Sequence, residues 1–357
     1  MGLYPHSRGH SRAGYGFATP GTADFRLDSV VAAPAPYEER RITRWDRDDA
    51  RQSLRDQVLT HLASPYAVLV LDESAFVKAN GRFVGAHRGT DGGGVSHHLQ
   101  TGVFLAYAGP KGNGYLDREL FLPRPWIERS DLRLSSGVPD GIAYSTRPQM
   151  ARRMLERAFE HQIPHRFVAG SITFGADRDL RAWLEERREA YVLAVPADMA
   201  LLVDGAYRSA EELAASLSHH TRASEGPEGW MGMRLPSGGG SRTGMQAGGR
   251  GDWQRWIVAE CKPRGAEPSD RFLAFVRPGT LLDDVVDAIK ASRRIRDGMS
   301  EARRTVGLDR FTGKSWEAWY RHMTVTLMAH TVLGLAREQL AAGSDPLRSR
   351  FDGDGYD

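Results

Sequence analysis

The sequence is poor in cysteine and in long apolar runs. Cys261 is its single cysteine in 357 residues, so an intramolecular disulfide and a cysteine-rich zinc site are both excluded. No stretch approaches the ~18 consecutive apolar residues that a membrane-spanning helix needs. The first residues also lack the apolar core of a signal peptide. We therefore expect a cytoplasmic protein with reduced thiols and no membrane partner.

A large excess of one charge is missing as well. The chain has 48 basic and 45 acidic residues, a net charge of +3, which permits nucleic-acid binding without arguing for it. What is present is the composition of a folded protein, with 41% hydrophobic and 26% charged residues. At about 150 residues per domain the length allows two domains or one elaborated domain.

The two ends of the chain differ in composition from the middle. Residues 1–45 are rich in Gly, Ser, Arg and Pro without an apolar period, which predicts a flexible arm. Residues 46–65 have apolar residues near 3.6-residue spacing and end at Ser64-Pro65, which predicts an N-terminal helix. Residues 342–357 are rich in Gly and Asp and are expected to be a flexible tail.

The middle of the chain alternates between strand and helix patterns. Residues 66–71 form a continuously apolar run that ends in Asp72-Glu73-Ser74, which is typical of a buried central strand. Further elements are predicted as a strand hairpin over 100–107 and 115–122, a helix from Thr146, a strand over 167–170, a helix over 178–188 and a strand over 191–195. This order predicts an α/β fold of the ribonuclease-H-like type, a mixed sheet flanked by helices.

One glycine-rich stretch interrupts this order. Residues 196–252 are polar and glycine-rich, and we expect an insertion there rather than part of the core. Strand patterns resume over 256–260 and 272–276, and helices follow over 281–304 and 315–341. The predicted main domain therefore spans residues 66–341.

Residues 69–74, Leu-Val-Leu-Asp-Glu-Ser, with Phe76 and Lys78 after them, resemble the first catalytic segment of bacterial insertion-sequence DDE transposases of the SRSO-type branch. Other blocks look like the same family, in the same order: residues 114–123 with Trp126, 180–187, 191–195, 307–309, and 319–322 with Ala329 and His330. The resemblance covers about residues 45–340. Several ordered blocks are far more specific than one short motif.

The resemblance implies two-metal phosphoryl transfer, in which three carboxylates hold two Mg²⁺ ions. It also implies that the insertion lies between the second and third catalytic positions. Asp72 stands at the first acidic position, but Ser171 stands at the second and Arg296 at the third. Arg303 stands at the family's lysine. The triad is thus expected to be degenerate, with no metal and no cofactor bound, and Mg²⁺ is expected only if another acid rescues the site.

Four neighbouring acids are candidates for rescue. Glu73 follows Asp72 and points to the opposite face if the strand continues. Asp297 is turned by about 100° from Arg296 on a helix. Asp177 and Asp179 open the helix after Ser171. We expect none to complete the site, because a guanidinium beside Asp72 repels Mg²⁺ and pairs with the carboxylate or binds an anion.

Basic residues surround the third position. Arg293, Arg294, Arg303 and Arg304 are candidates for binding nucleic acid or another anion, through salt-sensitive phosphate contacts. The alternative is a solvated helix face with nearby acids. Lys78 and Glu73 are also candidate catalytic residues. An equally good interpretation of Asp72 is an ancestral acid without a catalytic role. For Ser171, a loop or helix-capping serine is a simpler interpretation than a nucleophile.

Three functions follow from these residues. The first is a transposase-derived pseudoenzyme, related to the DDE endonucleases of DNA recombination, without metal-dependent strand transfer. The second is a repurposed enzyme that acts on an anionic small molecule in the former DDE cleft. The third is a non-catalytic DNA-binding protein. The sequence makes no prediction of the oligomeric state.

Overall fold

The computed structural model describes residues 45–90, 94–217, 223–225, 229–236, 253–260 and 270–343. The predicted arm before Trp45, the predicted tail after Gly343 and the glycine-rich residues 237–252 lie outside the described residues. None of the described helices is both long enough and apolar enough to cross a bilayer.

The described strands build one large mixed sheet and one separate hairpin. Across the sheet the order is β2 (His87–Thr90), β3 (Ser96–Gly109), β1 (Val68–Lys78), β5 (Phe167–Gly170), β6 (Tyr191–Ala194), β12 (Arg271–Val276), β11 (Gln254–Glu260), β10 (Trp230–Arg234) and β9 (Ala223–Glu225), and β4 (Gly112–Leu120) also pairs with β3. The hairpin consists of β7 (Ala200–Val203) and β8 (Ala206–Ser209).

Strand β1 is central, as its apolar run predicts. It pairs antiparallel with β3 along its whole length and parallel with β5, and β5 pairs parallel with β6. Strand β12 then runs antiparallel to β6. The predicted hairpin is the β3–β4 pair. This mixed sheet with its flanking helices confirms the α/β class and is consistent with a ribonuclease-H-like fold.

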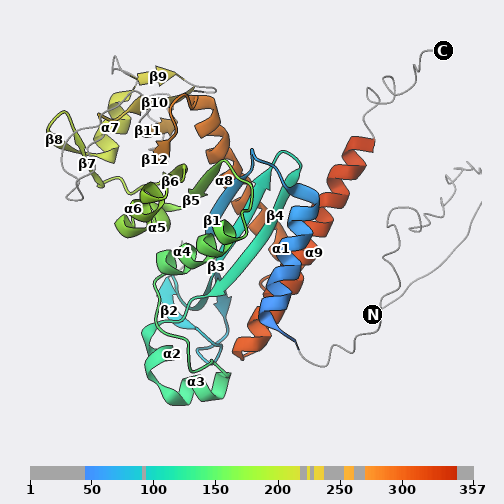
Figure 1. The fold of residues 1–357 in the computed structure, drawn as a ribbon. Helices are drawn as coiled ribbons and strands as arrows, with labels where there is room; N and C mark the ends of the chain where they lie inside the picture. The colour runs from blue at the N-terminus through green and yellow to red at the C-terminus, as the bar shows by residue number, and fades with distance from the viewer. Residues whose placement is uncertain are drawn as a thin grey trace, which may run out of the picture. The chain divides into compact units, whose positions relative to one another are not determined.

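Helices cover both faces of the sheet (Figure 1). One face is covered by α4 (Arg147–Glu160), α5 (Ile172–Gly175) and α6 (Arg178–Glu186). The other face is covered by α8 (Leu282–Thr305). Two further helices, α9 (Trp316–Gly343) and α1 (Arg47–Leu62), pack against each other and against β4. Alternate residues of β1 divide between these layers. Val70 and Phe76 join the core with α8 and α9, whereas Leu69 and Leu71 join the core with α4 and α6. Adjacent residues of β1 therefore face different environments.

The other described helices are α2 (Arg124–Glu128), α3 (Ser130–Ser136) and α7 (Ala210–Ser216). Local signals explain where the longer helices begin. Asp46 caps α1 by accepting from the backbone N–H groups of Asp48 and Asp49, as expected at a helix start. Thr146 and Gln149 form a capping box at the start of α4, with a proline in the first turn. Both starts agree with the predicted ones.

Part of the range 196–252 contributes to the core, and the insertion expected over this range stays a prediction. Strand β10 extends the large sheet beside β11, and Trp230 on it is 1% exposed. A Cβ atom at Gly232 would lie 2.8 Å from the side chain of Leu282 on α8. The glycine thus lets α8 pack closely against β10. Glycine content, which predicts a loop, here marks a close approach inside a sheet.

Candidate functional site

Asp72 lies on β1, on the face covered by α8, and is 8% exposed. Burial raises the pKa of its carboxyl to about 6, because removal from water disfavours the charged form. A hydrogen bond from the Glu73 backbone and the charges of Arg296 and Arg303 lower the pKa in part. Asp72 is therefore a buried acid inside a positive field.

Ser171 follows β5 directly and lies beside Asp72. Leu71 pairs with Gly170 in the parallel register, and the backbone of Ser171 is extended, with φ −72° and ψ 175°. It therefore continues the strand by one step past that pair. Its Oγ is buried and has no hydrogen-bond partner among the described residues. Ser171 also precedes α5 without capping it through its side chain, so helix capping does not explain this serine.

Arg296 and Arg303 approach the same strand from α8. Seven residues separate them, which is nearly two full turns, so they share one side of the helix. Arg296 is exposed. Arg303 is half-buried and donates to the hydroxyl of Ser74 and, at 3.0 Å, to the carbonyl oxygen of Ala75. The fold thus brings Asp72, Ser171 and Arg296 together.

Tyr115 on β4 completes this group and was not expected from sequence. It is 2% exposed, and its Oη has no hydrogen-bond partner within the described part of the chain. Burial raises its pKa, and the negative charge of Asp72 raises it further. Its ring centroid lies 6.2 Å from that of His330. We call Asp72, Tyr115, Ser171, Arg296 and Arg303 the Asp72 site. A buried tyrosine in a strand has no sequence signal that separates it from a core residue.

The acids near this site do not supply a metal centre. Glu73 faces the other layer, where its Oε2 accepts from Arg147 at 2.7 Å and its Oε1 from the hydroxyl of Thr173 at 2.5 Å. Asp177 caps α6 by accepting from a backbone N–H, and Asp297 is exposed. Within the described residues, no group of three or more His, Cys, Asp or Glu side chains is placed to hold a metal ion. Two divalent cations do not fit this donor set.

Lys78 lies far from Asp72. It is six residues further along β1, or ~20 Å at the rise of a strand. Its amine donates to the carbonyl oxygen of Phe311 at 3.0 Å and lies 5.2 to 5.9 Å from three phenylalanine ring centroids. Burial lowers its pKa to about 8, although Asp309 opposes the shift. The fold therefore does not bring Lys78 to Asp72, and its catalytic role stays a prediction.

The four arginines predicted to bind nucleic acid or another anion all lie on α8, but they have different environments. Arg293 lies 3.3 Å from a carboxylate oxygen of Glu260 and 5.0 Å from the ring centroid of Trp230. Arg303 is turned toward β1, as described above. Arg294 and Arg304 are exposed. Two of the four arginines thus have partners within the protein, and two face solvent.

The opposite face of the sheet holds a network of paired charges. Arg157 on α4 contacts Asp117 and Glu119 of β4, at 2.8 and 2.7 Å. Arg153 contacts Glu119 at 2.8 Å. Asp117 is buried, so its pairing with Arg157 compensates for the loss of water. This network is structural in character, because each of its acids already has a cationic partner.

One family model matches the chain. It is described as DDE superfamily endonuclease, and it matches residues 41–215. No curated protein matches the chain. The matched range includes Asp72 on β1 and Ser171 after β5, and it ends before α8. Residues 41–215 of this chain are therefore a DDE superfamily endonuclease domain.

Proposed function

We propose that this protein descends from insertion-sequence DDE transposases, retains DNA as its partner and does not carry out metal-dependent DNA strand transfer. The observation that supports it is the set of charges around Asp72. Ser171 and Arg296 stand where the resemblance expects acids, and Arg296 and Arg303 already act electrostatically on Asp72. The family match supports DNA as the partner.

The size of the electrostatic effect favours this proposal. A divalent cation about 6 Å from one guanidinium is repelled by roughly 5 kcal/mol at an effective dielectric constant of 20. A single carboxylate, with a pKa already raised to about 6, must overcome this repulsion for one ion, and the two-metal mechanism requires two ions. The same two arginines attract a phosphate, which suits DNA binding.

A plasmid-nicking assay tests the absence of strand transfer. Supercoiled DNA is incubated with the wild-type protein and with Asp72→Asn, in Mg²⁺ or in Mn²⁺. We expect no nicking by either protein above the level of a mock purification. Nicking by the wild type that disappears in Asp72→Asn would overturn the proposal.

A restoration experiment tests the charge argument directly. The double variant Ser171→Asp/Arg296→Glu replaces the hydroxyl and the cation with acids. We expect Mg²⁺ to raise the melting temperature of this variant and to leave that of the wild type unchanged. The matched control is Ser171→Asn/Arg296→Gln, which has similar shapes without the negative charges. Equal responses to Mg²⁺ in the wild type and the restored variant would contradict the argument.

The second candidate is an enzyme that acts on an anionic small molecule at the Asp72 site. The observation that favours it is three buried polar atoms without partners in the described part of the chain: Ser171 Oγ, Tyr115 Oη and Arg303 Nε. Buried polar groups without a hydrogen-bond partner are rare in folded proteins, and a ligand that supplies the missing partner is one explanation for them. Biosynthetic genes beside the coding region would favour this enzyme, and flanking inverted repeats would favour a transposase descendant. A steep salt dependence of duplex DNA affinity would instead favour DNA binding.

A further inference from the structure

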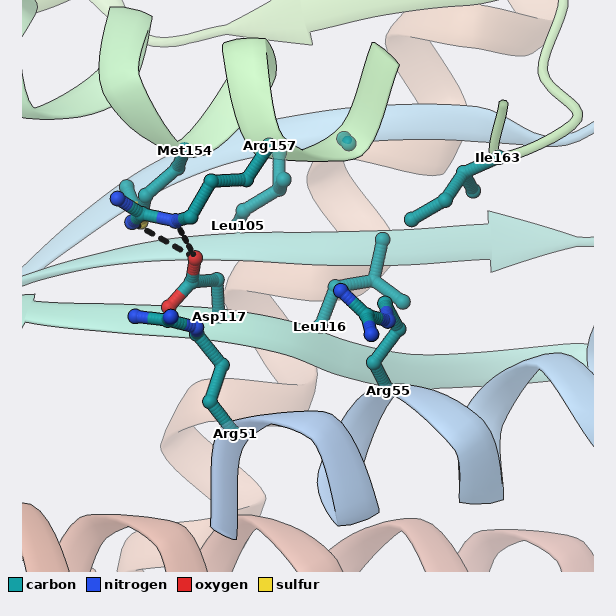
Figure 2. A pocket seen from close by; sticks show the side chains of 9 residues that line it. Arg51, Arg55, Leu105, Leu116, Asp117, Met154, Arg157 and Ile163 are labelled. Carbon is teal, nitrogen blue, oxygen red and sulfur yellow. Dashed lines mark hydrogen bonds and ion pairs between the residues drawn. The ribbon is translucent and has the colours of Figure 1, made fainter. Parts of the chain in front are cut away.

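A small cleft lies between α1, β4 and α4, away from the Asp72 site. Figure 2 shows Arg51 and Arg55 entering it from α1, with Arg157 entering from α4 on the far side of Asp117. Its cavity volume is about 10 Å³, which is room for about one water-sized group. Asp117 pairs with Leu105 of β3, which belongs to the α4 side of the core. The cleft is therefore on the sheet face opposite to Asp72.

Positive charge is in excess in this cleft. Its lining contains three arginines and one acid, Asp117, and that acid is already bound to Arg157. Arg51 and Arg55 have ion pairs only with Asp48 at 3.0 Å and Asp56 at 3.7 Å, within the described residues. Those two acids belong to α1 itself, and their side chains are 76% and 58% exposed. Water screens such contacts strongly.

Burial makes this excess costly without a ligand. The side chain of Arg55 is 13% exposed, and that of Arg51 is 27% exposed. The excess of positive charge also acts on the neighbouring Arg118. Burial lowers the pKa of its guanidinium, and the charges of Arg51 and Arg157 lower that pKa further, whereas the charge of Asp117 raises it. A partly buried group of cations that outnumbers its acids is stabilised by an added anion.

We propose that the cleft between α1, β4 and α4 binds a phosphoryl oxyanion, held by Arg51 and Arg55. The planar guanidinium is suited to bidentate contact with phosphate oxygens. The cavity admits one terminal oxygen, and the rest of the phosphoryl group lies at the mouth. Leu116 and Ile163 supply the apolar wall. The oxyanion comes either from the backbone of DNA or from a phosphorylated small molecule, and only the DNA source depends on the proposed function.

Calorimetry with inorganic phosphate tests the site. We expect Arg51→Gln/Arg55→Gln to bind phosphate at least tenfold more weakly than the wild type, since the loss of a single charge-assisted hydrogen bond is enough for a change of that size. The matched control Arg178→Gln/Arg208→Gln removes two exposed arginines elsewhere and should bind like the wild type. Unchanged binding in Arg51→Gln/Arg55→Gln would overturn the proposal.

Duplex DNA titrations at several salt concentrations identify the source of the oxyanion. If a DNA phosphate occupies the cleft, the slope of log affinity against log salt becomes shallower by about 0.9 for each contact that Arg51→Gln/Arg55→Gln removes. Weaker phosphate binding with an unchanged slope identifies a phosphorylated small molecule. Either result leaves the nicking assay unaffected, so a failure here is distinguishable from a failure of the proposed function.

Arginine modification tests the wild-type protein without relying on the folding of a variant. Phenylglyoxal is applied with and without inorganic phosphate, and modified residues are located by mass spectrometry. We expect phosphate to protect Arg51 and Arg55 and to leave Arg178 and Arg208 unprotected. Equal modification of Arg51 and Arg55 with and without phosphate would contradict the proposal.

Discussion

Asp72 and Glu73 are neighbours on β1 but lie on opposite faces of the sheet, and their carboxyl groups have different partners there. Glu73 is bound by Arg147 and Thr173 at hydrogen-bonding distances. Asp72 is buried near Arg296 and Arg303, and neither arginine forms a close ion pair with it within the described residues. On the α4 face Glu73 is therefore paired with a cation at short distance, whereas on the α8 face Asp72 and the two arginines interact only at longer range.

This difference indicates where chemistry or binding belongs. Paired charges such as Arg157 with Asp117 and Glu119 hold α4 onto the sheet. A buried acid with a raised pKa and unsatisfied hydroxyl groups around it is instead the pattern of a functional site. A folded chain retains such an arrangement at a cost in stability, so the two faces should respond differently to substitution.

The largest effect is expected on the paired face. Arg157→Ala leaves the buried carboxylate of Asp117 without its main cation, and breaking a buried pair in this way typically costs about 3–5 kcal/mol. We expect a loss of about 3 kcal/mol in the free energy of unfolding, measured by urea denaturation. The control is Arg152→Ala, whose pair with Glu156 is partly exposed and should contribute ~1 kcal/mol or less. Equal losses in the two variants would mean that the network is not structural.

Asp72→Asn and Glu73→Gln should change the free energy of unfolding in opposite directions. The pKa of Asp72 is about 6 in the folded protein and 3.8 as its ordinary value. The folded state therefore binds more protons between these values, and stability falls as pH rises through this window. An asparagine does not ionise, so Asp72→Asn avoids this fall in the free energy of unfolding. At pH 7 the variant should be more stable than the wild type by up to about 3 kcal/mol, and near pH 3 the two proteins should be equally stable.

Glu73→Gln is the matched comparison for Asp72→Asn. It weakens a partly exposed ion pair and should destabilise the protein by about 1 kcal/mol or less. Chemical denaturation of both variants at pH 3 and pH 7 measures these signs. A destabilising Asp72→Asn at pH 7 would show that Asp72 is a satisfied structural acid, and the contrast between the faces would disappear.

The smallest effect is expected from Arg296→Gln. Its positive charge lowers the pKa of Asp72, so its removal should raise that pKa slightly, because water screens an exposed charge. Carboxyl ¹³C NMR titration of Asp72 measures the change. Arg294→Gln is the control, because this exposed arginine lies about 200° away around α8. Equal pKa values of Asp72 in both variants would exclude Arg296 as a neighbour of Asp72.

Much of the fold could be predicted from local patterns. The apolar run before Asp72 predicts the central strand, and Thr146 with Pro148 predicts the start of α4. The surroundings of Lys78 and the place of β10 in the large sheet could not be predicted in this way. The apolar run does not show that β1 continues past Asp72 to Lys78, and glycine content does not show whether a glycine permits close packing.

By itself, the sequence predicted the main strands and helices around the apolar run and the acid at its end, and it proposed Ser171 and Arg296 for the other two family positions. Only the tertiary structure decided which of these groups meet. Asp72 and Glu73 face different layers because adjacent side chains alternate across a sheet. The burial that raises the pKa of Asp72, the Tyr115 hydroxyl beside it and the arginine cleft next to α1 depend on contacts between distant segments, which local sequence patterns do not encode.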